Sequence, residues 1–539
     1  MSITVPIIES RSSDITFPSE LWDVICSVLP KPSLSRLRLV CRGLNSIALP
    51  WTFRELRFEG FGNSTKNFVE IAKSPQLRHL VRELTVDTSV ELDFEYNCNE
   101  DYQFPTEFLD ALPYINCFKH LDALHLRFNH FCGDEDRTGI SIEETWDFRY
   151  RVLDTVCHCI AGMWTVERQM EIEDAVDDSP RDYKRTYPED EFDDSDQVIQ
   201  LKELTITNLA DFHDPRLASS EAFKRVVSLA SLRDLKILIT SQKDEDLDNS
   251  TVYYEEKYKF FKHLPRTWLN TNISNNLTTL SLYSEEFWGW FPKMDFRSMD
   301  FPNLQVLALG HYVFTHDWQI DWMSSIGQKN GVGGLRELYL DNCPILYQAN
   351  QASPLDENDP GYPVVSTVFR AAAEMHTYPI RWSDVLSRWA TSMKSLEVFR
   401  MGHSHWFVDE APEDTLESVL NHLGTDADDE GVLRHRLSNN VHRSFDCPEP
   451  IDRAYGDVDP QTEYKSGKYL RGTGINGRYG GKLQYIEYDV NCFPSPWKET
   501  FWSYRDDNEG FEPEDGAWTT DIAALQEFTL AVKARTAGN

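Results

Sequence analysis

The sequence predicts an α/β fold in which short N-terminal helices precede a long series of strand-forming segments. Three observations support this prediction. Residues 17–45 carry apolar side chains at helical spacing and are interrupted by prolines. From residue 60 onward, one short pattern of spaced apolar residues recurs along much of the chain. Further helices are expected around residues 146–168, near residues 258–261 and at residues 521–535.

The first N-terminal helix is predicted from apolar residues at positions i, i+3, i+4 and i+7, which share one helical face: Leu21, Val24, Ile25 and Val28. Ser19 is expected to cap this helix, and Pro30 and Pro32 are expected to end it, because proline lacks the backbone N–H. A second helix is expected after the cap Ser33, with a last helical turn that ends at Pro50. Its apolar stripe consists of Leu34, Leu37, Cys41 and Leu44.

These helices cannot form a domain alone, because about thirty residues bury too little surface to offset chain entropy. Two interpretations remain open. The helices fold back on the chain that follows, as an N-terminal cap, or they complete their core against the helices of another protein. Fully burying one Leu or Ile side chain is worth about 1.5–3 kcal/mol, so a handful of such anchors suffices for tight binding.

The order of these residues resembles the F-box family. Phe17-Pro18-Ser19-Glu20-Leu21 corresponds to the opening Leu-Pro-x-Glu-Leu motif, and Ile25 and Leu29 follow it. Later matches are Leu34, Leu37, Val40, Cys41 and Arg42, with an exit at Pro50-Trp51-Thr52-Phe53. Two positions depart from the family pattern: Phe17 replaces a leucine, and Leu44 stands where many members carry tryptophan.

The resemblance implies that the N-terminal helices bind a Skp-family adaptor, which joins F-box proteins to a cullin ubiquitin ligase. The residues expected to contact the adaptor are Phe17, Pro18, Leu21, Ile25, Leu34, Leu37, Val40 and Cys41. The expectation for the helices is that replacing Leu21 and Ile25 together with Ala abolishes adaptor binding and leaves the rest of the chain folded.

The recurring pattern in the long middle region is apolar-x-x-apolar-x-apolar. Its copies begin at Val81, Leu121, Leu201, Leu232, Leu277, Leu304, Leu335 and Leu396, with a distant copy at Leu483. The pattern resembles a degenerate leucine-rich repeat, in the style of large fungal families of F-box proteins. That resemblance implies short strands stacked into a parallel sheet that lines a curved solenoid. Asn129 and Cys343 stand where such repeats use a side chain to satisfy backbone groups of a turn.

The predicted domains are a tail at 1–14, the F-box-like segment at 15–58, a repeat domain at 60–410, and a C-terminal repeat and capping region at 411–539. Within the repeat domain, residues 171–197 hold twelve acidic and three basic residues and are expected to form a loop. The C-terminal helix is expected to place Ile522, Leu525, Phe528 and Val532 on one face. A terminal repeat needs such a cap, because its apolar edge would otherwise be exposed.

Composition disfavours several classes of partner. The chain has 88 acidic and 53 basic residues and a formal charge of −35, which disfavours nucleic acid and anionic membrane surfaces. The N-terminus does not have the pattern of a secretory signal, and no apolar run has the length of a membrane span. Ten scattered cysteines are typical of reduced thiols, so a cytoplasmic or nuclear protein is expected.

No segment carries a convincing catalytic or metal site. Gly472, Gly474 and Gly477 form a G-x-G-x-x-G string, but the residues after it break any helix. Residues 157–159 (Cys-His-Cys) are adjacent on a predicted helix and point in different directions, and His403 and His405 have no evident third ligand. We therefore expect no catalytic residue, no metal and no cofactor.

These observations predict a non-catalytic substrate-recruiting subunit of a Skp–cullin–F-box ubiquitin ligase. The F-box-like helices would bind the adaptor, and the repeat domain would bind a protein target whose identity the sequence does not indicate. The alternative is an interaction scaffold with an F-box-like helical cap that promotes no degradation.

Overall fold

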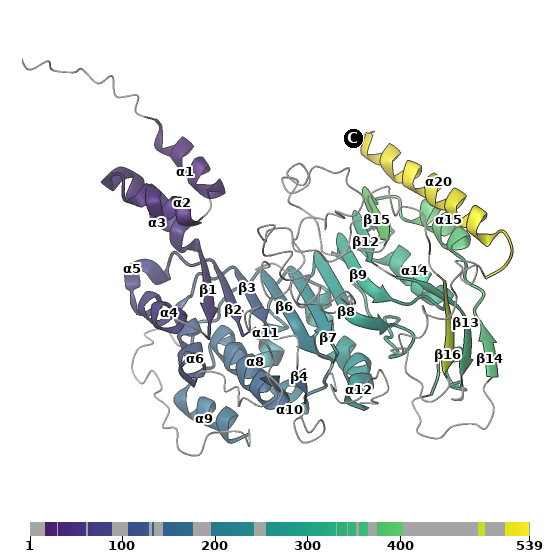
Figure 1. Ribbon diagram of the computed structural model, residues 1–539, viewed down its shortest axis with the longest axis horizontal. Coiled ribbons are helices and arrows are strands. Elements are labelled where there is room, and N and C mark those ends of the chain that lie inside the picture. Colours follow the sequence, from purple (N-terminus) through teal and green to yellow (C-terminus); the bar gives the residue numbers. More distant parts are fainter. Residues whose placement is uncertain are drawn as a thin grey trace, which may run out of the picture.

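The computed structural model describes residues 17–29, 31–60, 63–88, 106–128, 132–133, 144–175, 196–241, 255–329, 331–341, 343–351, 355–364, 374–402, 483, 485–490 and 513–537. Its main feature is a nine-stranded sheet in which every neighbouring pair of strands is parallel. The strands follow one another in chain order across the sheet (Figure 1). The predicted α/β class with a parallel sheet is confirmed.

The strands of this sheet are β1 (Glu55–Glu59), β2 (Glu83–Asp87), β3 (Ala123–Arg127), β6 (Glu203–Ala210), β7 (Asp234–Thr240), β8 (Thr279–Trp288), β9 (Val306–Tyr312), β12 (Glu337–Asp341) and β15 (Val398–Gly402). Eight of them coincide with the eight predicted copies of the apolar pattern. β1 was not predicted, although Phe53, Leu56 and Phe58 repeat the same spacing just after the N-terminal helices.

The copies align in one register across the sheet. The second apolar residues of the pattern are direct neighbours from strand to strand: Leu84, Leu124, Leu204, Leu235, Leu280, Leu307, Leu338 and Phe399. Side chains alternate between faces along a strand, so the second and third apolar residues point to the same side. A slip by one residue would turn this whole set away from the core, which is why burial fixes the register.

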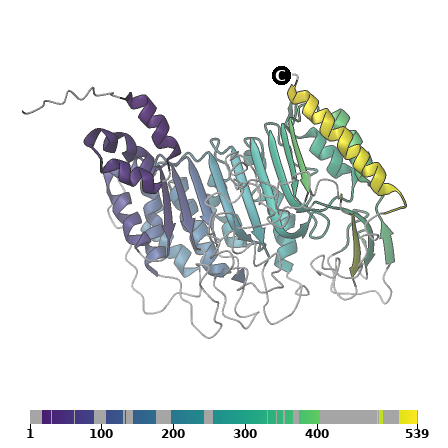
Figure 2. The ribbon, with the colours of Figure 1, turned by 45° about the horizontal axis from the view of Figure 1, so that its top comes forward.

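Helices cover the face of the sheet to which these residues point (Figure 2). They include α4 (Ser64–Lys73), α6 (Thr106–Ala111), η1 (Leu112–Cys117), α8 (Trp146–Ala161), α11 (Glu221–Val226), α12 (Glu255–His263), α14 (Asp317–Ser325) and α15 (Trp382–Ser392). Shorter or flanking helices are α5 (Pro75–Arg78), α9 (Val166–Asp174), α10 (Pro215–Ser219), η2 (Leu264–Arg266) and α13 (Thr271–Ser274). Strand and helix residues together form one large apolar core.

The helix predicted over residues 146–168 is two helices. Gly162 adopts a left-handed conformation (φ 62°) that ends α8, and a Cβ at this position would lie 2.5 Å from the carbonyl oxygen of Asp196. The following helix α9 extends to Asp174, into the start of the segment predicted as an acidic loop. Residues 176–195 of that segment lie outside the described residues, as does Asn129.

A separate sheet of three strands lies beside the C-terminal part of the large sheet. It contains β13 (Ile345–Gln351), β14 (Glu374–Thr377) and β16 (Tyr485–Val490), in the order β14-β13-β16. The distant copy of the apolar pattern at Leu483 leads into β16, which pairs with β13 in this sheet and not with the strands of the large sheet. Two-residue strands form two further pairs: β4 (Cys132–Gly133) with β5 (Glu144–Thr145), and β10 (Gln328–Lys329) with β11 (Val332–Gly333).

The last helix, α20 (Ala517–Ala537), packs on α15 beside the final strand of the sheet. Phe528 and Val532 are buried there, and Leu525 is partly buried against the same core, as the sequence predicts. Cys343 also behaves as expected, because its thiol donates to the carbonyl oxygens of Leu309 (3.3 Å) and Asp341 (3.4 Å).

Three helices lie at the opposite end of the sheet, beside β1 (Figures 1 and 2). They are α1 (Ser19–Val28), α2 (Lys31–Arg38) and α3 (Arg42–Arg54). The predicted caps Ser19 and Ser33 are wrong, since both residues are inside helices. Pro32 is likewise in the first turn of α2, where backbone N–H groups have no intrahelical partner and proline is tolerated.

The second predicted helix is divided into α2 and α3 by residues 39–41, and α3 continues through Pro50 to Arg54. Cys41 caps α3, because its sulfur accepts a hydrogen bond from the backbone N–H of Leu44 at 3.4 Å. Near Pro50, the hydroxyl of Thr52 donates to the carbonyl oxygen of Ala48 at 2.8 Å. The N-terminal segment is therefore a three-helix unit, and its last helix leads directly into β1.

Candidate functional site: an exposed apolar face on the N-terminal helices

The three N-terminal helices enclose a small apolar core of their own. Cys26, Leu34 and Ala48, one from each helix, are buried in it. Leu29, Leu37, Ile47 and Trp51 pack around them and are partly buried. From α1 and the residue after it, this core thus receives Cys26 and Leu29, and it does not include the predicted apolar stripe of the helix.

Polar contacts hold these helices together and join them to the sheet. Trp51 Nε1 donates to Asp23 Oδ1 at 2.8 Å, which links α3 to α1. Arg38 Nε donates to Asn45 Oδ1 at 3.1 Å, which links α2 to α3. Lys31 Nζ donates to the backbone carbonyl oxygen of Glu55, the first residue of β1, at 3.1 Å. The unit is therefore anchored to the edge of the sheet.

The outer face of α1 is apolar and exposed. Its side chains are Phe17 (45% exposed), Leu21 (47%), Val24 (62%) and Val28 (77%). These residues are spaced by four, three and four positions, which is the spacing of the contact seam between packed helices. The turn between α2 and α3 also exposes two large apolar side chains, Leu39 (87%) and Val40 (69%).

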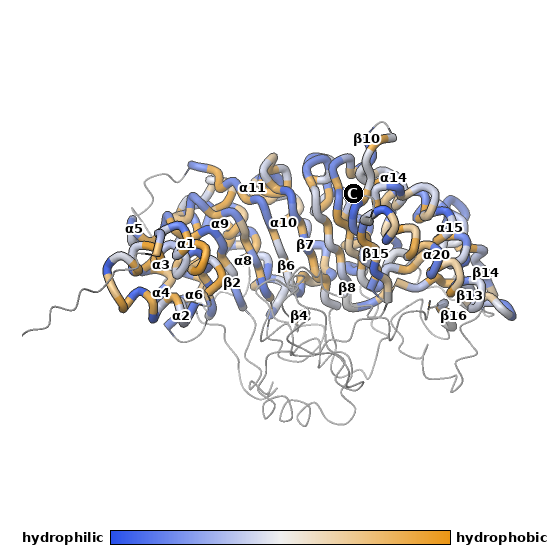
Figure 3. Tube along the Cα trace, turned by 90° about the horizontal axis from the view of Figure 1, so that it is seen from above, coloured by the Kyte–Doolittle hydropathy of each residue, from blue (hydrophilic) through white to orange (hydrophobic). Residues whose placement is uncertain are grey.

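We call these six side chains the docking face, and they concentrate much of the exposed apolar surface of the described residues in one short segment. The described part of the chain has eleven large apolar side chains that are exposed, and six of them lie within residues 17–40. Figure 3 shows the apolar segments of the three helices in orange. Exposed apolar side chains that gather on one small structural unit indicate an interaction site more often than scattered single residues do. The docking face therefore is the strongest candidate site in the described residues.

The structure places the eight predicted contact residues in different environments. Phe17, Pro18, Leu21, Val40 and Cys41 are exposed, and Ile25 and Leu37 are half-buried. Leu34 is 3% exposed and lies in the core of the three helices, so its side chain supports the docking face from inside. The predicted set is thus divided between the outer face and the inner core.

Three members of the docking face were missing from the predicted set: Val24, Val28 and Leu39. For α1 the signal was present in the sequence, since Phe17, Leu21, Val24 and Val28 share the four-three-four spacing of a seam. For Leu39 the signal depends on the break between α2 and α3. That break turns Leu39 and Val40 outward together.

The face of the sheet opposite the helices is a second surface of interest. Over the first five strands it is charged, and ion pairs join neighbouring strands: Arg57–Asp87 at 2.6 Å, Arg127–Asp87 at 3.2 Å and Lys236–Glu203 at 3.4 Å. His125 Nε2 also lies 3.2 Å from Glu83 Oε1. Farther along it becomes apolar, with Leu238, Tyr283, Ala308 and Tyr339 in contact. Most of these side chains are buried, and the charged ones are engaged with one another.

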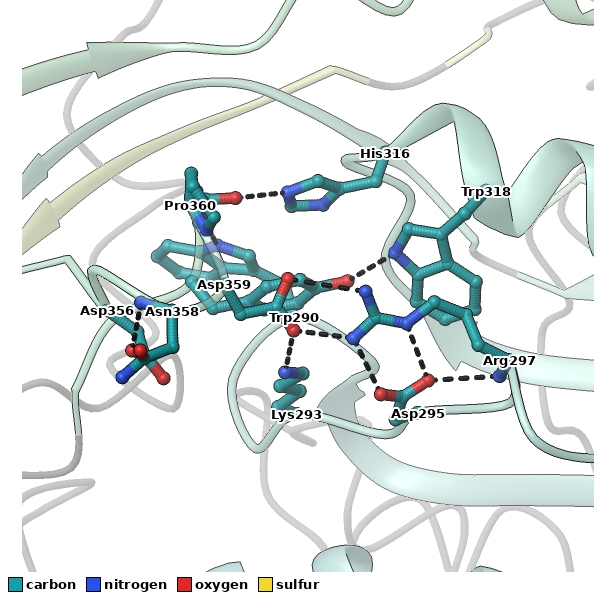
Figure 4. A network of polar contacts seen from close by, with 12 residues as sticks. Trp290, Lys293, Asp295, Arg297, His316, Trp318, Asp356, Asn358, Asp359 and Pro360 are labelled. Carbon is teal, nitrogen blue, oxygen red and sulfur yellow. Dashed lines mark hydrogen bonds and ion pairs between the residues drawn. The ribbon is translucent and has the colours of Figure 1, made fainter.

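A third cluster fixes residues 355–364 beside the C-terminal part of the sheet (Figure 4). The carboxylate of Asp359 contacts both Lys293 and Arg297, with Arg297 Nη2 at 2.5 Å from Asp359 Oδ2. Arg297 also pairs with Asp295 at 2.6 Å. The two cations lie over aromatic rings, Lys293 over Tyr362 and Arg297 over Trp318, so each charge has both an ionic and an aromatic contact.

Backbone carbonyl groups of the same segment are also bound. Trp290 Nε1 donates to Gly361 O at 2.9 Å, and His316 Nε2 donates to Pro360 O at 2.9 Å. Burial lowers the pKa of His316, so its imidazole is neutral at pH 7. Gly361 has φ 93°, and a Cβ there would lie 2.5 Å from His316 Nε2. These contacts close a second apolar core that contains Trp290, Tyr362 and Tyr378, which indicates a structural role.

Asp359→Asn is expected to speed hydrogen exchange of residues 355–364 at pH 7. It should also remove the acid dependence of the stability of this segment. Burial raises the pKa of Asp359, but hydrogen bonds from Arg297 and Lys293 outweigh it and hold the pKa below its ordinary value. The stability from this carboxylate is therefore present above the unfolded pKa of about 3.9 and is lost as the pH falls toward the lower folded value. Hydrogen exchange of the segment should quicken about fivefold in the variant at pH 7.

The control is Asp356→Asn, because Asp356 accepts a hydrogen bond only from the backbone of Asn358 among the contacts drawn for it in Figure 4. Its exchange should keep the acid sensitivity of the unmodified protein between about pH 3 and pH 7. Equal pH dependence in the Asp359 and Asp356 variants would contradict the assignment.

The motifs considered for chemistry do not form a site in the described residues. Cys157 and Cys159 are buried in α8, where burial raises the pKa of both thiols. His158 binds the carbonyl oxygen of Asp154 at 2.8 Å through Nδ1. The described residues contain no group of three His, Cys, Asp or Glu side chains that could hold a metal ion. His403, His405 and the glycines at 472–477 lie outside the described residues.

Comparison with known proteins adds no family. No family model matches the chain, and no curated protein matches it. Within the described residues, none of the helices combines the length and the apolar character needed to cross a membrane. Any functional assignment therefore rests on the residues of the chain itself.

Proposed function

We propose that this chain is the substrate-recognition subunit of a Skp–cullin–F-box ubiquitin ligase. The observation that carries the proposal is the docking face, an exposed apolar surface on three compact helices whose sequence resembles the F-box. The chain itself would catalyse no bond formation. It would hold a target protein close to a ubiquitin-loaded enzyme bound elsewhere in the assembly, which raises the effective concentration of the target.

The shape of the docking face supports a helical partner. The seam of Phe17, Leu21, Val24 and Val28 runs along one side of α1 and has the period of packed helices. An apolar stripe of this kind is buried when it lies against the helices of another protein. The seam does not fold back on the sheet domain, because its side chains remain 45–77% exposed. The interpretation as an N-terminal cap packed on the next domain is therefore disfavoured.

The rest of the chain supports the role of a target-binding platform. Nine parallel strands in chain order, with the apolar pattern in one register, are the arrangement that stacked leucine-rich repeats would produce. We propose that the described sheet is such an array. The three N-terminal helices and α20 lie at opposite ends of it, so an adaptor bound to α1 would leave most of the array accessible (Figure 1).

The proposal is tested by mixing the full chain with a purified Skp-family adaptor and analysing the mixture by size-exclusion chromatography. Co-elution as a one-to-one complex is the expected result, and separate elution would refute the proposal. The complex is then supplied with a cullin, a ubiquitin-conjugating enzyme and cell extract. Ubiquitination of captured proteins supports the ligase role, whereas adaptor binding without ubiquitination favours the scaffold.

A further inference from the structure

The docking face lies next to an unusually basic part of an acidic chain. Residues 29–54, which include α2 and α3, contain five basic residues and no Asp or Glu, although the chain as a whole has a formal charge of −35. The basic residues are Lys31, Arg36, Arg38, Arg42 and Arg54. A local positive surface on a protein of opposite net charge is available to attract an acidic partner to one place.

Three of these five cations are engaged within the chain. Lys31 donates to the carbonyl oxygen of Glu55, and Arg38 donates to Asn45 and lies over the ring of Phe53. Arg54 lies 5.5 Å from the centre of the Trp51 ring. These contacts stabilise the three helices and reduce the charge that is available to a partner.

Arg36 and Arg42 are different. Both side chains are exposed, and among the described residues neither guanidinium has an ion pair or a side-chain hydrogen bond. In the sequence they flank Leu39 and Val40, the two exposed apolar residues of the turn between α2 and α3. An apolar contact with a free arginine on each side is the chemistry that recognises an apolar surface edged by carboxylates.

The part of the docking face on α1 has neighbours of the opposite sign. Glu20 and Asp23 lie on α1 beside the seam, and Asp23 accepts the hydrogen bond from Trp51. The docking face therefore has acidic residues beside its part on α1 and basic residues beside its part at the turn between α2 and α3. This polarity would favour one orientation of a partner over the reverse orientation, because like charges in contact are unfavourable.

We infer that the docking face binds an acidic surface of a helical partner, with partner carboxylates placed opposite Arg36 and Arg42. The inference rests on the proposed function, in which that partner is the Skp-family adaptor, and it adds the charge that the adaptor must present. Because the remainder of the chain repels an acidic molecule, these arginines direct the encounter to the N-terminal helices. Exposed ion pairs contribute little to affinity, so the effect falls mainly on the association rate.

The test measures association and dissociation rates of the full chain with the purified adaptor at low and moderate salt. Arg36→Glu combined with Arg42→Glu should slow association about tenfold at low salt and have little effect on dissociation. The difference should shrink as added salt screens the charges. By contrast, loss of apolar contacts should act mainly on dissociation.

The matched control is Arg225→Glu combined with Arg266→Glu, two exposed arginines on the helices that cover the sheet. It changes the net charge by the same amount and should alter the association rate less than about twofold. Equal slowing in both double variants would show that only net charge matters and would overturn the inference. An association rate of the unmodified chain that does not depend on salt would also overturn the inference. In both of these cases the proposed function would stand. Failure of the unmodified chain to bind the adaptor would instead defeat the proposed function, and this inference with it.

Discussion

Replacing Leu21, Val24 and Val28 together with Ala is expected to weaken adaptor binding by about 100-fold and to leave the stability of the chain nearly unchanged. The three substitutions remove seven carbon atoms, and each buried CH2 group is worth about 0.8 kcal/mol. If a partner covers about half of this surface, the loss is close to 3 kcal/mol, which corresponds to that change in affinity. Isothermal titration calorimetry with the adaptor measures it directly.

Stability is expected to persist because these side chains are 47–77% exposed and do not contribute to the core of the three helices. Leu34→Ala provides the contrast, since Leu34 is 3% exposed in that core and its truncation should unfold the helices and reduce binding indirectly. Leu530→Ala is the matched control, because Leu530 is 66% exposed on α20 at the other end of the molecule. Unchanged affinity in the triple variant would exclude α1 as the contact surface.

Glu144→Ala is expected to destabilise the chain by about 3–5 kcal/mol, because it removes one partner of a buried ion pair. Glu144 and Arg149 are 1% and 3% exposed, and their side chains meet at 2.8 Å between Arg149 Nε and Glu144 Oε2. Thr88 also donates to Glu144, and Arg149 Nη1 donates to the carbonyl oxygen of Asn208 at 2.6 Å. This group therefore joins α8 to β6 and to the residue that follows β2. Urea unfolding followed by circular dichroism measures its contribution.

The control is Glu221→Ala on α11, whose carboxylate pairs with Lys224 at 2.7 Å but is 76% exposed. An exposed pair of this kind contributes about 1 kcal/mol or less, so the control should hardly shift the unfolding curve. Equal effects of the two substitutions would contradict the assigned difference in burial. A double replacement of Glu144 by Gln and Arg149 by Met should recover part of the loss, because no uncompensated charge then remains inside.

The strands could be predicted because their signal is local. Each copy of the pattern places its apolar residues on one side of a short strand, and eight copies point to one sheet regardless of what lies between them. Two details of this part have local explanations. β1 was overlooked because its pattern overlaps the end of the N-terminal helices, and β16 has the right spacing but pairs with β13.

Helix boundaries were less predictable than helix positions. Serine residues near prolines resemble caps, yet Ser19 and Ser33 are inside helices, because the preceding residues already adopt helical or capping conformations. The division between α2 and α3 also escaped prediction, although it is what exposes Leu39 and Val40. Apolar spacing shows that a helix has an apolar face. The residue at which one helix ends and the next begins depends on how the neighbouring segments pack.

The amino-acid sequence by itself determined the α/β class, the order and register of the repeated strands, and the presence of apolar helices before them. These properties follow from the periodicity of single elements, which the chain carries in its local pattern. The tertiary structure decided which apolar side chains of those helices are enclosed and which are exposed. Cys26, Leu34 and Ala48 meet from three different helices, whereas Leu21, Val24 and Val28 find no cover among the described residues. Burial is a property of contacts between distant segments, so only the folded chain distinguishes a core residue from a residue available to a partner.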